Sequence, residues 1–141
     1  MATRVTAEDF LAALLATLAK RGWAEAISIR GDRFDAAATE AFDALRSASQ
    51  RFDLDVRFFV KPHPKYGEST VMRDAIARLA QWDLLSLDNP EYQVIRLKIS
   101  SEYADQLLSR LALPAEVLSR IADAFVRSYE GARAPAGAAR S

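Results

Sequence analysis

Residues 84–100 read LLSLDNPEYQVIRLKIS and have the pattern of two strands joined by a turn. In the second strand, apolar side chains alternate with Arg96 and Lys98, which is the period of a strand with one buried and one open face. The segment DNPE at 88–91 supplies Asn and Pro, which favour a turn. The stretch therefore predicts a hairpin in a small sheet, with Arg96 and Lys98 on the open face and available to an acidic protein partner.

The segments next to the hairpin read as helices. Before it, residues 70–82 carry apolar side chains at helical spacing, and Ser69 or Thr70 is suited to cap this helix. After it, Ser101 is expected to cap a fourth helix. Pro114 stands where the first turn of a fifth helix would begin.

Two helices and two strands are predicted further upstream. The first helix is expected to start after Thr6, with Asp9 three residues on as its capping partner, and to stop at Gly22. The remaining predicted elements are a strand over 26–30, a helix over 35–51 and a strand over 56–60 that Pro62 ends.

The predicted elements follow the order α-β-α-β-α-β-β-α-α. This order favours an α/β domain of the α+β type, in which five helices cover a small mixed four-stranded sheet. A chain of 141 residues, half of them hydrophobic, fits one such globular domain, which we assign to residues 1–130. Residues 131–141, GARAPAGAARS, contain no bulky apolar side chain and predict a disordered tail.

The composition restricts the chemistry. Cysteine is absent, which excludes disulfides and thiol catalysis, and the single histidine, His63, cannot build a multi-histidine site. The carboxylates show no metal-ligand spacing and no glycine-rich phosphate loop is present, so the sequence predicts no metal, no cofactor and no catalytic set. The apolar runs are too short for a membrane helix and the N-terminus does not read as a signal peptide, so we expect a cytoplasmic protein. The abundance of Ala, and of Arg over Lys, is typical of a GC-rich bacterial genome.

Positive charge is concentrated in one part of a chain whose formal net charge is zero. Residues 57–78 contain five basic and two acidic side chains. In the helix predicted over 70–82, the spacing of the apolar residues places Arg73 and Arg78 on the outward face.

Residues 69–111 resemble the second half of a MarR-type winged-helix regulator. The residues that carry the resemblance are Ser69, Thr70 and Arg73 at the helix opening, Leu84 and Leu85 in the first strand, Asn89-Pro90 in the turn and IRLKIS in the return strand. The resemblance implies a DNA-binding transcription regulator whose hairpin is a wing. The side chains that would meet phosphates and base edges are Lys61, Lys65, Ser69, Thr70, Arg73 and Arg78. The chain departs from the family in having Asp83 where glycine is usual, an acidic turn, and strand 56–60 where a helix is usual.

Three functions therefore remain open. The first is a small non-catalytic bacterial regulatory or assembly protein that acts through protein–protein contacts, which the zero net charge favours. The second is the winged-helix-like DNA-binding regulator. The third is a small enzyme centred on His63, which lies between two prolines with Lys61, Lys65 and Tyr66 nearby. The alternative for His63 is a solvated loop histidine that makes a local hydrogen bond. His63 and Tyr66 are also candidates for binding a protein partner.

The last two predicted helices suggest self-association. They carry more apolar side chains than a thin sheet is expected to cover, which favours a homodimer. The residues expected at that interface are Leu107, Leu108, Leu111, Leu118, Ile121, Phe125 and Val126.

Overall fold

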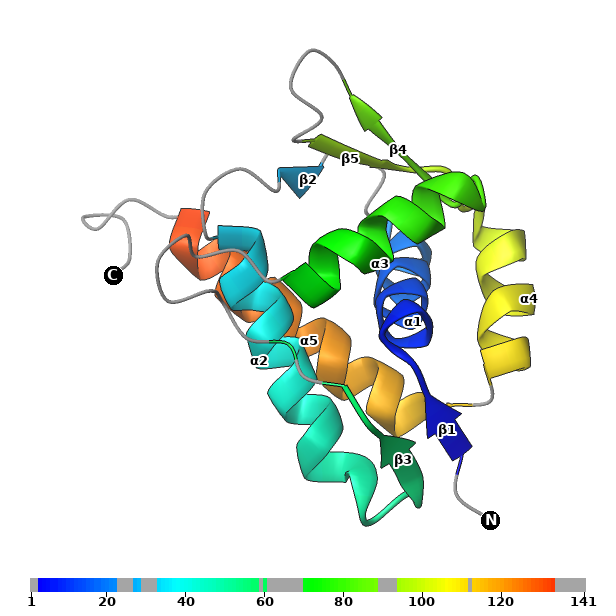
Figure 1. Ribbon diagram of the computed structural model, residues 1–141, viewed down its shortest axis with the longest axis vertical. Coiled ribbons are helices and arrows are strands. Elements are labelled where there is room, and N and C mark those ends of the chain that lie inside the picture. The colour runs from blue at the N-terminus through cyan, green and yellow to red at the C-terminus, as the bar shows by residue number, and fades with distance from the viewer. Residues whose placement is uncertain are drawn as a thin grey trace.

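The computed structural model describes residues 3–22, 27–28, 33–58, 60, 70–88, 94–111 and 113–133. In chain order these form β1 (Thr3–Val5), α1 (Ala7–Lys20), β2 (Ile27–Ser28), α2 (Arg33–Ser49), β3 (Leu54–Val56), α3 (Thr70–Gln81), β4 (Leu85–Asp88), β5 (Val94–Leu97), α4 (Ser101–Leu111) and α5 (Ala115–Arg133) (Figure 1). The described part of the chain is thus a mixed α/β fold with five helices, which confirms the predicted class.

The described strands form two separate small sheets, where the sequence predicts one sheet of four strands. β1 pairs with β3 in parallel, with Val5 opposite Val56. β2, β5 and β4 form an antiparallel sheet in that order. The prediction of a single sheet is wrong, because β3 pairs with β1 and not with the hairpin. In addition, Arg57, Phe58 and Val60, which the sequence places in a strand, are not in one.

The hairpin that the sequence predicts is present as β4 and β5. The apolar pairs on its inner face are Leu85 with Leu97 and Leu87 with Ile95. Leu85 and Ile95 are buried, whereas Arg96 and Lys98 are exposed, as the alternation predicts. The turn residues 89–93 lie outside the described part of the chain.

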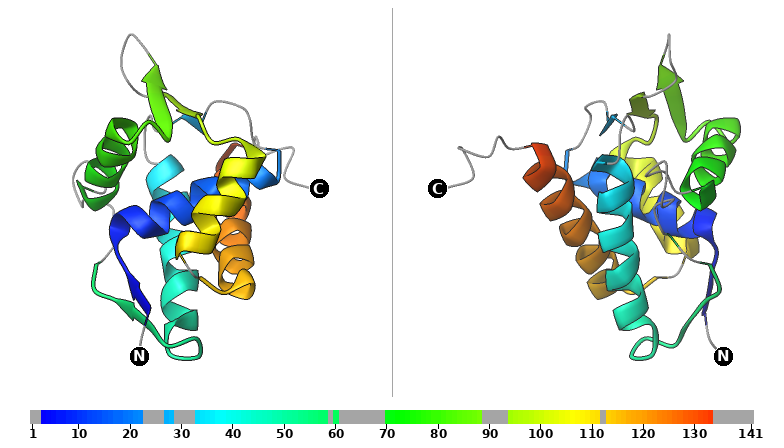
Figure 2. Two further views of the ribbon diagram at one scale, coloured as in Figure 1. Left: turned by 90° about the vertical axis from the view of Figure 1, so that its right-hand side faces the viewer. Right: turned by 60° about the vertical axis from the view of Figure 1, so that its left-hand side comes forward.

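α1 lies at the centre of the fold, where it contacts α3, α4 and α5 (Figures 1 and 2). The sequence predicts an apolar stripe along one side of this helix, but the structure buries every residue of 10–16 as well as Leu18. A helix with neighbours on several sides needs apolar residues around most of its circumference. Three alanines, Ala12, Ala13 and Ala16, supply the additional buried positions.

α2 and α5 pack along one another beside α1 (Figure 2). The Phe34 ring of α2 meets the Phe125 ring of α5 edge to face, with 5.8 Å between centroids, and Phe125 stacks on Tyr129 at 5.4 Å. Ile121 and Phe125 have no exposed surface. The sequence assigns both to a dimer interface. This assignment is wrong, because the two side chains fill the core of the chain itself.

The caps of the helices agree with the sequence at α1 and differ by one residue at α4. Thr6 Oγ1 accepts from the Asp9 amide and Asp9 Oδ2 accepts from the Thr6 amide, both at 3.1 Å, which confirms the predicted cap. At α4 the cap is Ser100 and not Ser101. Ser100 Oγ accepts from the Tyr103 amide at 3.1 Å, and Ser101 is already the first helical residue.

α5 extends beyond the end that the sequence predicts for the domain. It continues to Arg133, so residues 131–133, which the sequence assigns to the tail, are helical. The rest of that segment, 134–141, lies outside the described residues. Among the helices described, none combines the length and apolar character that crossing a membrane requires.

Candidate functional site

Arg73, a predicted DNA contact, is turned toward a neighbouring helix. Its Nη2 donates to Oδ2 of Asp35 at 2.8 Å. Asp35 stands in the first turn of α2. Among the described residues, it is the charged residue that is buried in the core. Its side chain is 0 % exposed and that of Arg73 is 22 % exposed. The outward orientation predicted from spacing is wrong, because a buried carboxylate needs a cation beside it and Arg73 fills that role.

The other predicted DNA contacts are only partly described. Arg78 is 62 % exposed, and its Nε lies 3.7 Å from Oε2 of Glu8 on α1. Thr70 is the first residue of α3. Lys61, Lys65 and Ser69 lie outside the described residues.

Two of the four residues predicted to meet a protein partner can be placed. Arg96 is exposed in β5, and Lys98 is exposed just after the end of that strand. Lys98 forms an ion pair with Asp83, which follows α3. His63 and Tyr66 lie outside the described part of the chain, and so does any site around the histidine.

The apolar residues of α4 and α5 are used largely inside the chain. Besides Ile121 and Phe125, which are buried, the predicted interface residues Leu107, Leu108, Leu111, Leu118 and Val126 are half-buried and pack against the core. α4 turns its apolar side to α1, and its outward side is polar, with Glu102, Gln106 and Arg110 exposed. Most of the apolar surface that the sequence predicts on α4 and α5 is therefore covered within the chain. The part that stays accessible lies between these two helices.

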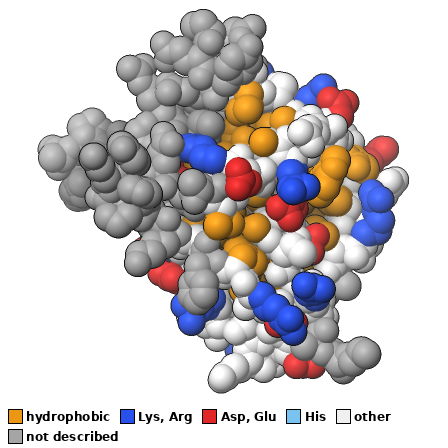
Figure 3. Space-filling model, in the orientation of Figure 1, with side chains coloured by type: hydrophobic (Ala, Val, Ile, Leu, Met, Phe, Trp, Pro, Cys, Tyr) orange, Lys and Arg blue, Asp and Glu red, His pale blue; other side chains and the backbone are white. Residues whose placement is uncertain are grey.

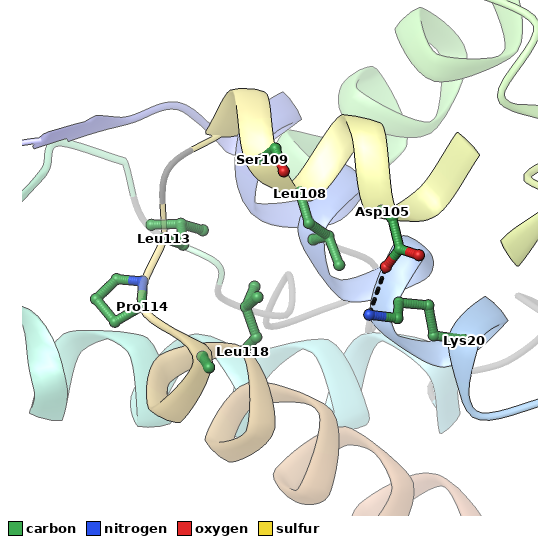
Figure 4. Close-up of a pocket in the computed structure, with 8 residues that line it drawn as sticks. Lys20, Asp105, Leu108, Ser109, Leu113, Pro114 and Leu118 are labelled. Carbon is green, nitrogen blue, oxygen red and sulfur yellow. Dashed lines mark ion pairs between the residues drawn. The ribbon is translucent and has the colours of Figure 1, made fainter. Parts of the chain in front are cut away.

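An open hollow of about 640 Å³ lies between α4 and the start of α5 (Figure 4). Leu108 points into it from α4, and Leu113 and Leu118 line it from the other side. Lys20 Nζ lies 2.6 Å from Asp105 Oδ1 at the edge of the hollow, and this ion pair ties the end of α1 to α4. The hollow thus has a mixed lining, in which leucine side chains lie next to a serine and a charged pair.

Further ion pairs are formed by residues that neighbour the lining in the chain or follow it on α5. Arg21, beside Lys20, pairs with Asp123 of α5 at 2.9 Å. Glu116, beside Ala115, accepts from Arg120 at 2.6 Å and from Arg51, which follows α2, at 3.2 Å. All these side chains are substantially exposed.

Trp82 is the exposed large hydrophobic side chain of the described residues, at 56 %. It stands at the next position of the helical series Ala75 and Leu79, both of which are buried, yet it is itself exposed. Two ion pairs are formed by its neighbours in the chain. Arg78, one turn earlier, pairs with Glu8, and Asp83, the residue after Trp82, pairs with Lys98. Nothing in the local sequence pattern marks Trp82 as a surface residue.

The end of α3 explains the exposure of Trp82. Asp83 has a φ of +62°, the left-handed conformation. The Leu84 amide donates to the Leu79 carbonyl at 3.0 Å and the Asp83 amide to the Ala80 carbonyl at 3.1 Å. These two bonds form the helix-ending turn that usually places glycine at the left-handed position. The chain therefore turns away immediately after Trp82, and Asp83 occupies a position that favours glycine.

The face of the molecule seen in Figure 3 is mixed in character. Figure 3 shows basic and acidic side chains interspersed on one face, with small apolar areas between them. Within the described residues, no three His, Cys, Asp or Glu side chains are grouped so as to hold a metal ion. Comparisons with protein-family models, curated proteins and solved structures found no match.

Proposed function

We propose that this chain is a small non-catalytic regulatory or assembly protein that acts through protein–protein contacts. The observation that carries the proposal is the hollow between α4 and α5, which Leu108, Leu113 and Leu118 line and the described residues do not fill. Protein-binding surfaces combine apolar side chains with polar and charged ones, as this hollow does.

The charge of the chain supports a protein partner. The formal net charge is zero, and the ion pair Lys20–Asp105 gives the hollow a charge of each sign. Nucleic-acid binders usually carry a basic excess that attracts phosphates. A surface of mixed sign instead suits another protein with charges of both signs.

Site-specific photocrosslinking in the producing cells tests this proposal. Ser109 is exposed and lines the hollow, so a photoreactive amino acid at this position is expected to give one discrete protein adduct. The matched control is Ala36, an exposed residue of α2 that lines a different, smaller hollow beside α5. An adduct from position 109 that is absent at 36 and is lost in Ala115→Glu agrees with the proposal. No protein adduct from position 109 contradicts it.

A second candidate function is DNA binding by the α3–hairpin unit. The observation that favours it is the β4–β5 hairpin directly after α3, the order of recognition helix and wing in the resemblance described above. Fluorescence anisotropy with duplex DNA at low salt tests it. Arg78→Glu should lower affinity at least tenfold, because it removes one phosphate contact and adds repulsion. Arg73→Glu is a poor probe, since it would also break the pair with Asp35.

A further inference from the structure

We infer that α4 is a lid over α1, and that it opens by local unfolding while the rest of the described structure stays folded. Three features of α4 support this: few buried side chains, weak ties to other helices and incomplete packing beside it. Neither the lid nor its opening depends on the proposed function.

The buried surface of α4 is small. Among its 11 residues, Ala104 is the buried one. Its larger apolar side chains are half-buried, namely Tyr103, Leu107, Leu108 and Leu111. Each of the other helices buries at least one large side chain completely: Leu14 in α1, Leu45 in α2, Leu79 in α3 and Phe125 in α5. Because apolar burial supplies most of the free energy that holds an element in place, α4 is the helix that is held least firmly.

The ties between α4 and its neighbours are weak. α4 packs mainly on α1 (Figure 1). Within the described residues, the ion pair that joins α4 to another helix is Lys20–Asp105, and both side chains are exposed, so the pair contributes little to stability. The Ser100 cap and the contact of Arg110 with the Tyr103 ring are local to α4. They stabilise the helix itself and do not hold it against α1.

The space beside α4 is incompletely packed. The hollow of about 640 Å³ separates part of α4 from the start of α5, and Leu108 borders it (Figure 4). A helix next to such a space can move without displacing close-packed side chains. Ile99 and Leu113, which flank α4 in the chain, are buried and would anchor its two ends during opening. Opening would then uncover the side of α1 that faces α4.

Thiol labelling of the full chain tests the lid, because the chain contains no cysteine and an introduced thiol is unique. Ala104→Cys places a thiol on α4, and the matched control Ala122→Cys places one on α5. Both alanines have no exposed surface, so a thiol-reactive dye reaches either position only when the protein opens there. We expect position 104 to react at least about tenfold faster than position 122, with little dependence on low concentrations of urea, since only α4 needs to open.

A further substitution, Phe34→Leu, separates local opening from global unfolding. It weakens the contact with Phe125 that joins α2 to α5, and it therefore destabilises the body of the fold. The labelling rate at position 122 should rise severalfold, whereas the rate at position 104 should not change. Hydrogen exchange of the wild-type chain provides a readout without cysteine, and we expect the α4 amides to be less protected than those of α1.

Equal labelling rates at positions 104 and 122 would overturn the lid. A rate at position 104 that rises together with the rate at position 122 in Phe34→Leu would overturn it as well, because α4 would then open only when the whole chain unfolds. Thermal melting confirms that each cysteine variant is folded before labelling. Wild-type α4 amides that are as strongly protected as those of α1 would exclude local opening whatever the variants show.

Discussion

The Asp35–Arg73 pair illustrates how one buried charge decides the orientation of a neighbouring side chain. Asp35 has a fully buried side chain, and its 2.8 Å bond to Arg73 joins the first turn of α2 to α3. Helical spacing assigns Arg73 to the outer face, because periodicity considers only the apolar positions of its own helix. The partner is 38 residues away in the sequence and could not be read from that pattern.

We expect Arg73→Ala to lower the free energy of unfolding by about 3–5 kcal/mol, since it leaves the Asp35 carboxylate buried without its cation. Urea unfolding followed by circular dichroism measures the change. The control is Arg78→Ala, which breaks an exposed pair and should cost at most about 1 kcal/mol. Equal effects of the two substitutions would mean that the Asp35 pair is not a buried one.

Asp83 provides a second test at the scale of one residue. Its φ of +62° is unfavourable for any side chain but acceptable for glycine. Asp83→Gly and Asp83→Ala both remove the carboxylate that pairs with Lys98, so their difference reports on the backbone. We expect the glycine variant to be more stable in urea by about 1 kcal/mol. An alanine variant of equal or greater stability would show that the residue does not adopt the left-handed conformation.

At the scale of elements, the helices could be predicted and the strand pairing could not. Capping residues and apolar spacing are local signals, and they place α1 after Thr6 and α3 at Thr70. β1 has three residues, TRV, which is too short for an alternating pattern. Its parallel pairing with β3 joins Thr3 to Leu54, and no local signal relates segments so far apart. The hairpin could be predicted because its strands are neighbours in the chain.

The cap of α4 is Ser100 in the structure and Ser101 in the sequence prediction, and two substitutions can tell these apart. Ser100→Ala removes the hydroxyl that accepts from the Tyr103 amide, and we expect it to lower the free energy of unfolding by about 1 kcal/mol. Ser101→Ala should change it by no more than about 0.5 kcal/mol, because Ser101 is exposed within the first turn. Chemical denaturation of the two variants compares them directly. The reverse order would restore Ser101 as the cap.

At the scale of the whole molecule, the candidate site could be predicted only in part. Leu108 and Leu118, expected at an interface, do line the hollow, because apolar spacing identifies which residues seek burial. The same signal cannot say whether burial is against the chain itself or against a partner, and Ile121 and Phe125 are buried internally. Trp82 was missed because its exposure depends on where α3 ends and not on spacing.

The placement of Phe125 in the core can be tested against the dimer interpretation. Phe125→Ala should lower the free energy of unfolding by about 3–5 kcal/mol, because it empties the contact with Phe34 and Tyr129. The loss should be the same at every protein concentration, since the contact lies within one chain. Unfolding midpoints measured over a hundredfold range of concentration check this. A loss that shrinks as concentration rises would indicate that the residue is covered by a second subunit.

The packing of α2 on α5 also has a consequence for how the chain is made. α2 comprises residues 33–49, and the helix that covers it, residues 115–133, is the last described element to leave the ribosome. Until then, Phe34 and its apolar neighbours have no native partner on α5, and the nascent chain must keep them from aggregating or rely on a chaperone. Translation that stops after α4 would release a polypeptide whose α2 face stays uncovered, which quality-control proteases would recognise as unfolded.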